Sequence, residues 1–421
     1  MNILYIHQYF TTRDGATGTR SYEFAKHLVA QGHSVTVITG DAHLKAYMPA
    51  SDERVARFTM DGIEVVAIRN AYSNYMSTTA RIKSFLSFMA KASRLSLQDK
   101  NIDVVLATST PLTVAIPALL RRMWRKTPFV FEVRDLWPEA PIQMGIIRSP
   151  IVKKVLKTVE QHTYRKAEHV IALSPGMAKG VTDEGIATEK VTMIPNCSDL
   201  SLFDPSKAAA PELQAKYGLE GKFVVVHGGS MGIANGLQCV VEAAAALKRR
   251  QDDSVAFLLT GDGKTKPELE EACRREGLDN IHFTGSVPRK DMPDILALAD
   301  LTLTSFQKVP ILATNSPNKF FDAMAAGKPI LVNSNGWTRQ IVEGCKIGEY
   351  VDPDEPEAFA DTLQRLKQDP EWLEEMGKRA RAVAENDYDR QKLALHVERV
   401  LTNAVRPASA HRLKEAQARK F

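Results

Sequence analysis

The sequence predicts two α/β domains of similar size, each built as a parallel sheet with helices on both faces. Short apolar runs alternate with helical patterns along the chain, which is typical of parallel strands joined by crossover helices. The alternation restarts at 223–229, "FVVVHGG", after a segment that has no clear period. A chain of 421 residues is also too long for one ordinary hydrophobic core.

The first half of the chain holds the first predicted sheet. Strands are expected at 3–7, 34–39, 63–68, 103–108, 129–133, 169–174 and 191–195. Helices are expected at 19–31, 111–125, 149–166 and 175–184. Because parallel strands end at the same edge of a sheet, the residues that follow them should meet at a ligand-binding face.

The second half repeats this organisation. Strands are expected at 223–229, 256–261, 281–285, 301–306, 329–333 and 348–352. Helices are expected at 236–250, 265–277, 289–298, 316–326, 356–368 and 371–385. The segment 196–213 is rich in turn residues and is the expected linker and hinge. We therefore expect a first domain at 1–200, a second at 201–385, a helical basic tail at 386–421, and a ligand cleft between the two domains.

Composition and cysteine spacing limit the class of protein. The four cysteines are scattered, with no C-x-x-C pair, which favours reduced thiols and argues against a structural zinc site. No run approaches the roughly 18 apolar residues of a membrane span, and the start has no signal-peptide pattern. We expect a cytoplasmic protein, or one on the inner face of the cytoplasmic membrane. The net charge of +5 comes without a nucleic-acid-reading motif, so no nucleic-acid partner is expected.

Positive residues gather in a few stretches, among them 81–95, 121–126 and 411–421. The stretch 81–95, "RIKSFLSFMAKASRL", predicts an amphipathic helix with basic residues beside an apolar face. The expected apolar face comprises Ile82, Phe85, Leu86, Phe88 and Met89. Such a helix can lie on an anionic membrane surface. A core-facing helix with a solvated rim has the same pattern, and the sequence leaves both interpretations open.

The first strand of the second sheet runs into a glycine-rich loop, "HGGSMGIANGL". Its glycines lie between a strand and a helix, at Gly228, Gly229, Gly232 and Gly236. Backbone N–H groups of such a loop, around Ser230, can cradle a phosphate. The alternative is a tight strand-to-helix turn, although a turn rarely needs four glycines.

The stretch 316–331, "SPNKFFDAMAAGKPIL", predicts a short helix with Ser316 as its N-cap. Asn318, Lys319 and Asp322 share one face of this helix, since they are three or four residues apart. The helix N-terminus and Lys319 offer an anion site, and Asp322 can accept hydrogen bonds from ribose hydroxyls. The alternative is a surface ion pair between Lys319 and Asp322.

The first strand of the chain leads into "QYFTTRDGATGTR", where Gly15 and Gly18 precede a helix. The spacing is not G-x-G-x-x-G, so a dinucleotide fingerprint is not indicated. The two glycines still allow the backbone to approach a bound substrate closely. Arg20 either helps to bind that substrate or is solvated. His7, at the end of the strand, is either a catalytic base or a packed residue.

Charged residues also crowd the end of the strand 129–133, in "FEVRDLWPEAP". Arg134 and Asp135 at this position indicate a site more than a scaffold. Asp135 can orient an acceptor hydroxyl, and the alternative is a structural Arg134–Asp135 pair. Asp262, in the turn "TGDGKTKPEL", either faces a base or ribose or belongs to the turn alone.

Taken together, these stretches resemble the retaining GT-B glycosyltransferases of the family 4 group, over roughly residues 1 to 385. The resemblance is carried by "SYEFAKHLVAQGHSVTVIT", "MIPNCSDLSLFDP", "GSVPRKDMPDILALADLTL" and "FFDAMAAGKPIL". It implies two Rossmann-like domains facing a central cleft, with the acceptor on the first and the nucleotide-sugar on the second. "EVRDLWPEAP" and "SPNKFFDAMAAGKP" are most similar to bacterial enzymes of O-antigen and capsule assembly, including N-acetylfucosaminyltransferases.

The resemblance implies roles for the helix 316–326. In this family the acid of that helix holds the ribose of the donor, and Asp322 stands where Glu is usual. The family's other Glu falls on Thr314, and the usual Arg and Lys of the glycine loop fall on Ser230 and Asn235. Lys319 is the expected replacement cation for the diphosphate, with Arg289 as a second candidate.

The resemblance also implies a reaction. We expect a retaining transfer from a nucleotide diphosphate donor, UDP-linked and of the UDP-N-acetylfucosamine type, to a sugar on undecaprenyl diphosphate. Asp135, Arg134 and His7 are the candidate catalytic residues, and the departing phosphate itself can accept the proton. No D-x-D motif offers a metal a site, so no metal and no cofactor besides the donor are expected. The alternatives are another GT-B nucleotide-sugar enzyme with a soluble acceptor, and a non-catalytic partner in a glycan assembly complex.

Overall fold

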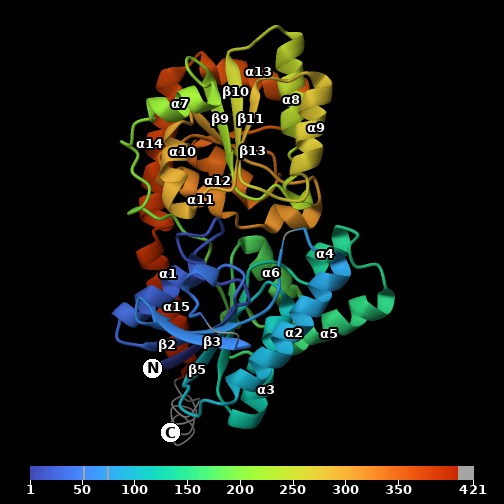
Figure 1. The fold of residues 1–421 in the computed structure, drawn as a ribbon, viewed down its shortest axis with the longest axis vertical. Helices are drawn as coiled ribbons and strands as arrows, with labels where there is room; N and C mark the ends of the chain where they lie inside the picture. The colour runs from blue at the N-terminus through green and yellow to red at the C-terminus, as the bar shows by residue number, and fades with distance from the viewer. Residues whose placement is uncertain (51–52, 74, 406–421) are drawn as a thin grey trace, which may run out of the picture.

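The computed structural model describes residues 1–50, 53–73 and 75–405, folded as two α/β domains stacked along the long axis of the molecule (Figure 1). The basic cluster at 411–421 and the end of the expected tail lie outside the described residues. Each domain has its own sheet, and the expectation of two doubly wound domains is confirmed.

The first domain contains an eight-stranded sheet of order β3-β4-β2-β1-β5-β6-β7-β8. Its strands are β1 (Asn2–Ile6), β2 (Ser34–Gly40), β3 (Val55–Met60), β4 (Ile63–Ile68), β5 (Val104–Thr108), β6 (Phe129–Val133), β7 (His169–Ala172) and β8 (Val191–Met193). The expected strands are all present. Every residue of β5 and β6 is buried, because helices cover both faces of the sheet.

The sequence reading missed β3, which pairs antiparallel with β4 at one edge of the sheet. Asp61 and Gly62 join the two strands with φ angles of 48° and 76°. An Asp-Gly pair with two positive φ angles is typical of a tight hairpin. This dipeptide was the available sequence signal for the extra strand.

The helices of the first domain include an amphipathic one where it was expected. They are α1 (Arg20–Ala30), α2 (Thr78–Ser96), α3 (Ala115–Arg125), α4 (Glu139–Gln143), α5 (Pro150–Lys166) and α6 (Pro175–Asp183). Ser77, Ser149 and Ser174 begin α2, α5 and α6 by accepting a hydrogen bond from a backbone N–H in the first turn. Serine at this position satisfies a donor that the helix itself cannot.

The second domain contains a six-stranded parallel sheet of order β11-β10-β9-β12-β13-β14. Its strands are β9 (Phe223–Gly228), β10 (Val255–Thr260), β11 (Ile281–Gly285), β12 (Leu301–Thr304), β13 (Ile330–Val332) and β14 (Gly348–Tyr350). The helices are α7 (Pro211–Tyr217), α8 (Gln238–Arg249), α9 (Lys266–Glu276), α10 (Met292–Ala297), α11 (Asn318–Ala325), α12 (Trp337–Cys345), α13 (Pro356–Lys367) and α14 (Pro370–Asp387). Only α7 and α12 were not expected in this half.

The last helix, α15 (Arg390–Val405), returns to the first domain. It packs beside α1, β5 and β6, as the adjacent red and blue helices of Figure 1 show. Leu393, Val397 and Leu401 are buried in the first domain's core. The described part of the segment expected as a basic tail is therefore an integral helix of that core.

The chain thus crosses between the domains twice, and the two crossings lie together. The backbone N–H of Ser198 donates to Tyr388 O at 2.8 Å. Asp199 beside them joins an ion cluster, because it pairs with Arg13 at 3.1 Å and also with Arg390. This cluster ties the linker, the α14–α15 junction and the first domain at one place.

Candidate active site

A cavity of about 630 Å³ lies between the domains, at the carboxyl ends of strands from both sheets. This is where open α/β sheets bind ligands. Of the predicted site residues, it is lined by His7, Gly18, Arg134, Asp135, Gly229, Ser230, Asp262, Arg289, Asn318, Lys319 and Asp322. Gly15 and Gly232, also predicted for the site, are not among the lining residues.

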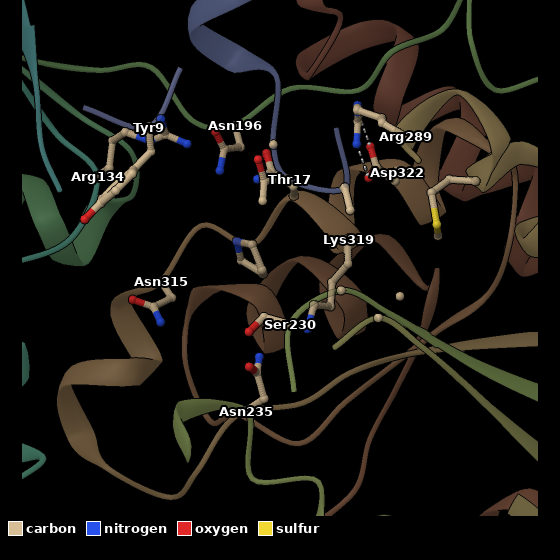
Figure 2. Close-up of a pocket in the computed structure, with 18 of the residues that line it drawn as sticks. Tyr9, Thr17, Arg134, Asn196, Ser230, Asn235, Arg289, Asn315, Lys319 and Asp322 are labelled. Atoms are coloured by element: carbon tan, nitrogen blue, oxygen red, sulfur yellow. Dashed lines mark hydrogen bonds and ion pairs between the residues drawn. The ribbon is translucent and has the colours of Figure 1, made fainter. Parts of the chain in front are cut away.

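Lys319, on the first turn of α11, points toward the glycine loop (Figure 2). Its Nζ lies 3.1 Å from Nε2 of His227. The other ring nitrogen of His227 lies 3.2 Å from Leu303 O, so it carries the proton and Nε2 accepts from the lysine. Burial lowers the pKa of Lys319 to about 7, and burial with the nearby lysine holds the pKa of His227 well below its usual range.

Asp322 does not pair with Lys319, so the alternative of a surface ion pair within the helix is wrong. Its two oxygens accept from the guanidinium of Arg289 at 2.8 and 2.6 Å. Both side chains are about 10% exposed. Arg289 was predicted as a second phosphate cation, but its charge is compensated by Asp322. One uncompensated cation, Lys319, remains on this side of the cavity among the described residues.

The glycine loop does not present the open set of N–H groups that the sequence suggested. The backbone N–H groups of Gly229, Met231 and Gly232 are already used within the domain. Their acceptors are Thr260 O at 2.8 Å, Asp262 O at 2.9 Å and Asn235 Oδ1 at 3.2 Å. Gly229 instead allows close packing, since a Cβ on it would lie 3.2 Å from Cε of Lys319. The predicted phosphate cradle is therefore reduced to the Ser230 side chain and the lysine beneath the loop.

Helix α11 begins two residues later than expected, and Ser316 does not cap it. The Ser316 hydroxyl accepts from the backbone N–H of Asn196 at 3.1 Å, and Ser316 O accepts from Asn196 Nδ2 at 2.5 Å. These bonds join the linker to the start of α11. Asn196 also lines the cavity, and its Oδ1 is buried without a hydrogen-bond partner among the described residues.

The loop that contains Gly15 and Gly18 docks against the second domain. Gly15 O accepts from the backbone N–H of Arg289 at 2.9 Å. A Cβ on Gly18 would lie 2.2 Å from Nδ2 of Asn318. Gly18 thus allows the domains to approach each other closely, whereas Gly15 contacts the second domain through its backbone carbonyl and does not line the cavity. Arg20 is neither solvated nor in the cavity, because it is buried in an ion pair with Glu132 at 2.9 Å.

On the first domain, Asp135 accepts from the Thr110 hydroxyl at 2.7 Å, and burial raises its pKa. Arg134 Nη1 lies 3.4 Å from His7 Nε2. The alternative of a direct Arg134–Asp135 pair is therefore not what the structure contains. Burial, reinforced by the charge of Arg134, keeps the pKa of His7 well below its usual range, so His7 is neutral.

The remaining predicted positions have mixed outcomes. Asp262 lines the cavity and accepts from the Tyr75 hydroxyl of the opposite domain at 2.6 Å. Thr314 is not a lining residue, and its side chain packs against Gly176 of α6. Several lining residues were missed, among them Tyr9, Thr17, Asn196 and Asn315. Asn196 could have been found, because it follows the last strand of the first sheet.

Two family models match most of the chain. The model described as "Glycosyl transferase 4-like domain" matches residues 15–197, and "Glycosyl transferases group 1" matches residues 210–383. The chain belongs to the GT4-type glycosyltransferases. It is therefore an enzyme that transfers a sugar from a nucleotide-sugar donor, and the predicted class of reaction is confirmed at this level.

Curated relatives are distant. The putative colanic acid biosynthesis glycosyl transferase WcaI of Escherichia coli is 24% identical over 82% of this glycosyltransferase and 87% of its own length. Alpha-D-kanosaminyltransferase of Streptomyces kanamyceticus is 26% identical over 55% of this chain. That match spans 59% of the relative, less than two thirds of its length.

Solved structures confirm the GT-B fold. Sucrose-phosphate synthase from Thermosynechococcus elongatus superimposes with a TM-score of 0.74 at 16% identity, covering 96% of this glycosyltransferase and 99% of that chain. HepE of Anabaena, in complex with UDP and glucose, has a TM-score of 0.71 at 20% identity, with the same two coverages. Within the described residues, no helix is both long and apolar enough to cross a membrane.

Proposed function

We propose that this glycosyltransferase moves a sugar from a UDP-linked donor to a sugar carried on a polyprenyl diphosphate such as undecaprenyl diphosphate, in the assembly of a surface polysaccharide such as O-antigen or capsule. The observation that carries the proposal is that one helix beside the cavity bears both an uncompensated cation, Lys319, and a buried carboxylate, Asp322. A nucleoside diphosphate needs both a partner for its phosphates and an acceptor for its ribose hydroxyls.

The donor diphosphate binds at Lys319, the Ser230 side chain and the N-terminus of α11. When the bond to the sugar breaks, negative charge develops on the leaving phosphate. Lys319 then stabilises this charge, and the proposal includes no metal and no other cofactor. Asp322 uses two of about four lone-pair positions on Arg289, so it can still accept from the ribose.

The acceptor hydroxyl binds on the first-domain side of the cavity. Asp135 lines the cavity there and orients that hydroxyl. His7 is neutral but is a weak base, since its pKa is low. In the proposed retaining reaction the departing phosphate therefore accepts the proton on the same face of the sugar. An N-acetylfucosamine-type sugar is the narrower form of the donor that the sequence resemblance suggests.

A lipid-linked acceptor is supported by the surface of the first domain. On α2, Phe88 is buried in the core and Phe85 packs against Trp137, but Ile82 and Leu86 are 50% and 49% exposed. On α5, Ile151 and Val155 are 75% and 56% exposed. Both helices lie on the same side of the domain (Figure 1).

Basic residues accompany these apolar side chains, with Lys83 on α2 and Lys153 and Lys154 on α5. We name the exposed apolar residues Ile82, Leu86, Ile151 and Val155, with these lysines, the α2–α5 surface. Its composition suits the inner face of a membrane, where the lipid head groups are anionic. Two relatives are named as putative colanic acid and teichuronic acid biosynthesis glycosyltransferases, and both names concern polysaccharides.

The direct test is calorimetric binding of UDP, GDP and ADP to the wild type, to Lys319→Gln and to the surface control Lys100→Gln. We expect UDP to bind most tightly, and Lys319→Gln to weaken UDP binding by about tenfold or more, the loss typical of a charge-assisted contact. A donor screen with UDP-sugars and membrane extracts then follows. Absence of nucleotide binding would contradict the proposed donor site, whereas full turnover with a water-soluble acceptor would favour the soluble-acceptor enzyme.

A further inference from the structure

We propose a second anion-binding site in the cavity, centred on Arg134, that holds an oxyanion of the acceptor. The oxyanion is a phosphate of a lipid diphosphate or the carboxylate of an acidic sugar. The inference rests on the proposed function, because it assigns to the acceptor a part of the same cavity.

Arg134 is a cation without a counter-ion. It follows β6, and its backbone N–H donates to Ser109 Oγ at 2.9 Å, which fixes the start of its side chain. Its guanidinium approaches His7, a neutral group, and forms no ion pair within the part of the chain that the structure describes. A guanidinium has five N–H donors in a planar fork, a geometry that matches carboxylate and phosphate. Most of these donors remain available to a ligand in the cavity.

The two nearby carboxylates are engaged elsewhere. Glu132 is fully buried, pairs with Arg20 at 2.9 Å and accepts from Thr108 at 2.5 Å. Asp135 accepts from the Thr110 hydroxyl instead of from Arg134. The charge of Arg134 is therefore directed to the cavity and not to a neighbouring acid.

Two further polar groups beside Arg134 lack partners among the described residues. His7 is 4% exposed and its Nδ1 has no hydrogen-bond partner, and neither has the buried hydroxyl of Tyr9. Since Nε2 of His7 faces the guanidinium of Arg134, Nε2 is the acceptor and Nδ1 carries the proton. Unpaired buried donors are costly, so their presence in a cavity wall indicates a ligand that supplies oxygen acceptors.

This group lies apart from the proposed diphosphate site. Figure 2 shows Arg134 and Tyr9 together on one side of the cavity, and Lys319 with Ser230 and Asn235 on another. Asn196 and Thr17, both uncharged, lie between the two groups in this view. The Arg134 group belongs to the first domain and the Lys319 group to the second. A donor diphosphate bound at Lys319 therefore leaves Arg134 available for a second ligand. The transferred sugar would then occupy the uncharged region between two anions.

The test measures binding of a second anion to enzyme already saturated with UDP. Geranyl diphosphate represents the lipid diphosphate, glucuronate represents an acidic sugar, and geraniol is the uncharged control. We expect one of the two anions to bind the wild type by calorimetry, and geraniol to bind at least tenfold more weakly. We expect Arg134→Gln to weaken the binding of that anion about tenfold or more, and Arg134→Lys to lose less.

Arg94→Gln, an exposed arginine on α2, is the matched control and should bind both ligands as the wild type does. An unchanged UDP affinity in Arg134→Gln shows that the variant is folded and that its donor site is intact. The anion whose binding Arg134→Gln weakens shows whether the bound oxyanion belongs to the lipid or to the sugar. The inference is overturned if neither anion binds the UDP-saturated wild type, or if Arg134→Gln binds it equally well.

Failure of UDP to bind contradicts the proposed function instead. The same anions are then titrated into the nucleotide-free protein. Loss of binding in Arg134→Gln but not in Lys319→Gln would still locate the second site, and the opposite result would overturn it.

Discussion

The ammonium of Lys319 lies 3.1 Å from the neutral imidazole of His227, and no carboxylate among the described residues forms an ion pair with it. The imidazole is held by the carbonyl of Leu303, so it accepts from the lysine without adding charge. The lysine is therefore positioned but not neutralised. An anion that enters the cavity meets a cation whose charge no other residue satisfies.

UDP affinity should fall as the pH rises above 7. The pKa of Lys319 is lowered to about 7 in the ligand-free protein, and a bound diphosphate raises it. Below pH 7 the lysine is protonated in both states, whereas above it binding must take up a proton. The affinity should then fall by up to about tenfold per pH unit until the pKa of the complex is reached. Calorimetry at pH 6.5, 7.5 and 8.5 measures this.

Lys319→Arg is the control for this prediction, because arginine stays charged throughout that range. Its UDP affinity should depend much less on pH than that of the wild type. Proton uptake at pH 7.5, measured in buffers of different ionisation enthalpy, should be present in the wild type and absent in the variant. A flat pH profile for the wild type would show that another group carries the phosphate.

Removing one partner of the Arg289–Asp322 pair should lower the free energy of unfolding far more than removing both. Asp322→Leu leaves a buried guanidinium without its counter-ion, which typically costs about 3–5 kcal/mol in the free energy of unfolding. The double variant Arg289→Leu/Asp322→Leu should recover most of this loss. Urea unfolding of the two single variants and the double variant provides the measurement, and additive losses would contradict a coupled pair.

Asp322 should also distinguish UDP from its 2′,3′-dideoxy analogue. If the carboxylate accepts from the ribose hydroxyls, the wild type prefers UDP by about 1.5–3 kcal/mol, typical of a hydrogen bond to a charged group. In Asp322→Asn, which keeps the size of the side chain, the preference should shrink by at least half. Calorimetry with both ligands checks this, and an undiminished preference would place the ribose elsewhere.

Gly229→Ala should weaken UDP binding in addition to the loss of stability that its backbone strain causes. Gly229 has a φ of +133°, and a new Cβ would press on Cε of Lys319 at 3.2 Å. Gly185→Ala is the matched control, since Gly185 has a φ of +77° but open surroundings. Both variants should lose about 1–3 kcal/mol of stability in urea unfolding. Only Gly229→Ala should bind UDP more weakly, and equal UDP affinities would show that the lysine can shift without effect.

The α2–α5 surface should bind anionic vesicles. Ile151→Asp/Val155→Asp should reduce binding to phosphatidylglycerol vesicles by about tenfold or more. The double variant removes apolar area that the membrane would bury and adds negative charge at the membrane surface. Leu395→Asp, at a 39% exposed site on α15, is the matched control and should bind as the wild type does. Co-sedimentation at two salt concentrations measures this, and UDP affinity should not change. Equal binding by all three proteins would remove this surface from the proposal.

Much of the fold could be predicted because its signals are local. The burial of β5 and β10 on both faces requires continuous apolar runs, and serines such as Ser149 mark helix starts. The edge strand β3 was missed because its pattern is only partly apolar. The destination of α15 could not be predicted, since an apolar stripe does not specify which of two cores it joins.

The sequence by itself placed His7, Arg134, Lys319 and Asp322 at the cleft, because chain order puts them after strands or at a helix start. Only the tertiary structure decided how their charges are matched. Arg289 neutralises Asp322 from 33 residues away, while Lys319 and Arg134 are left without acidic partners among the described residues. Only the tertiary structure likewise showed that amides of the glycine loop bond to the end of a neighbouring strand. Spacing along a chain fixes the face on which a group lies, but hydrogen bonding and ion pairing depend on contacts between segments that are distant in sequence.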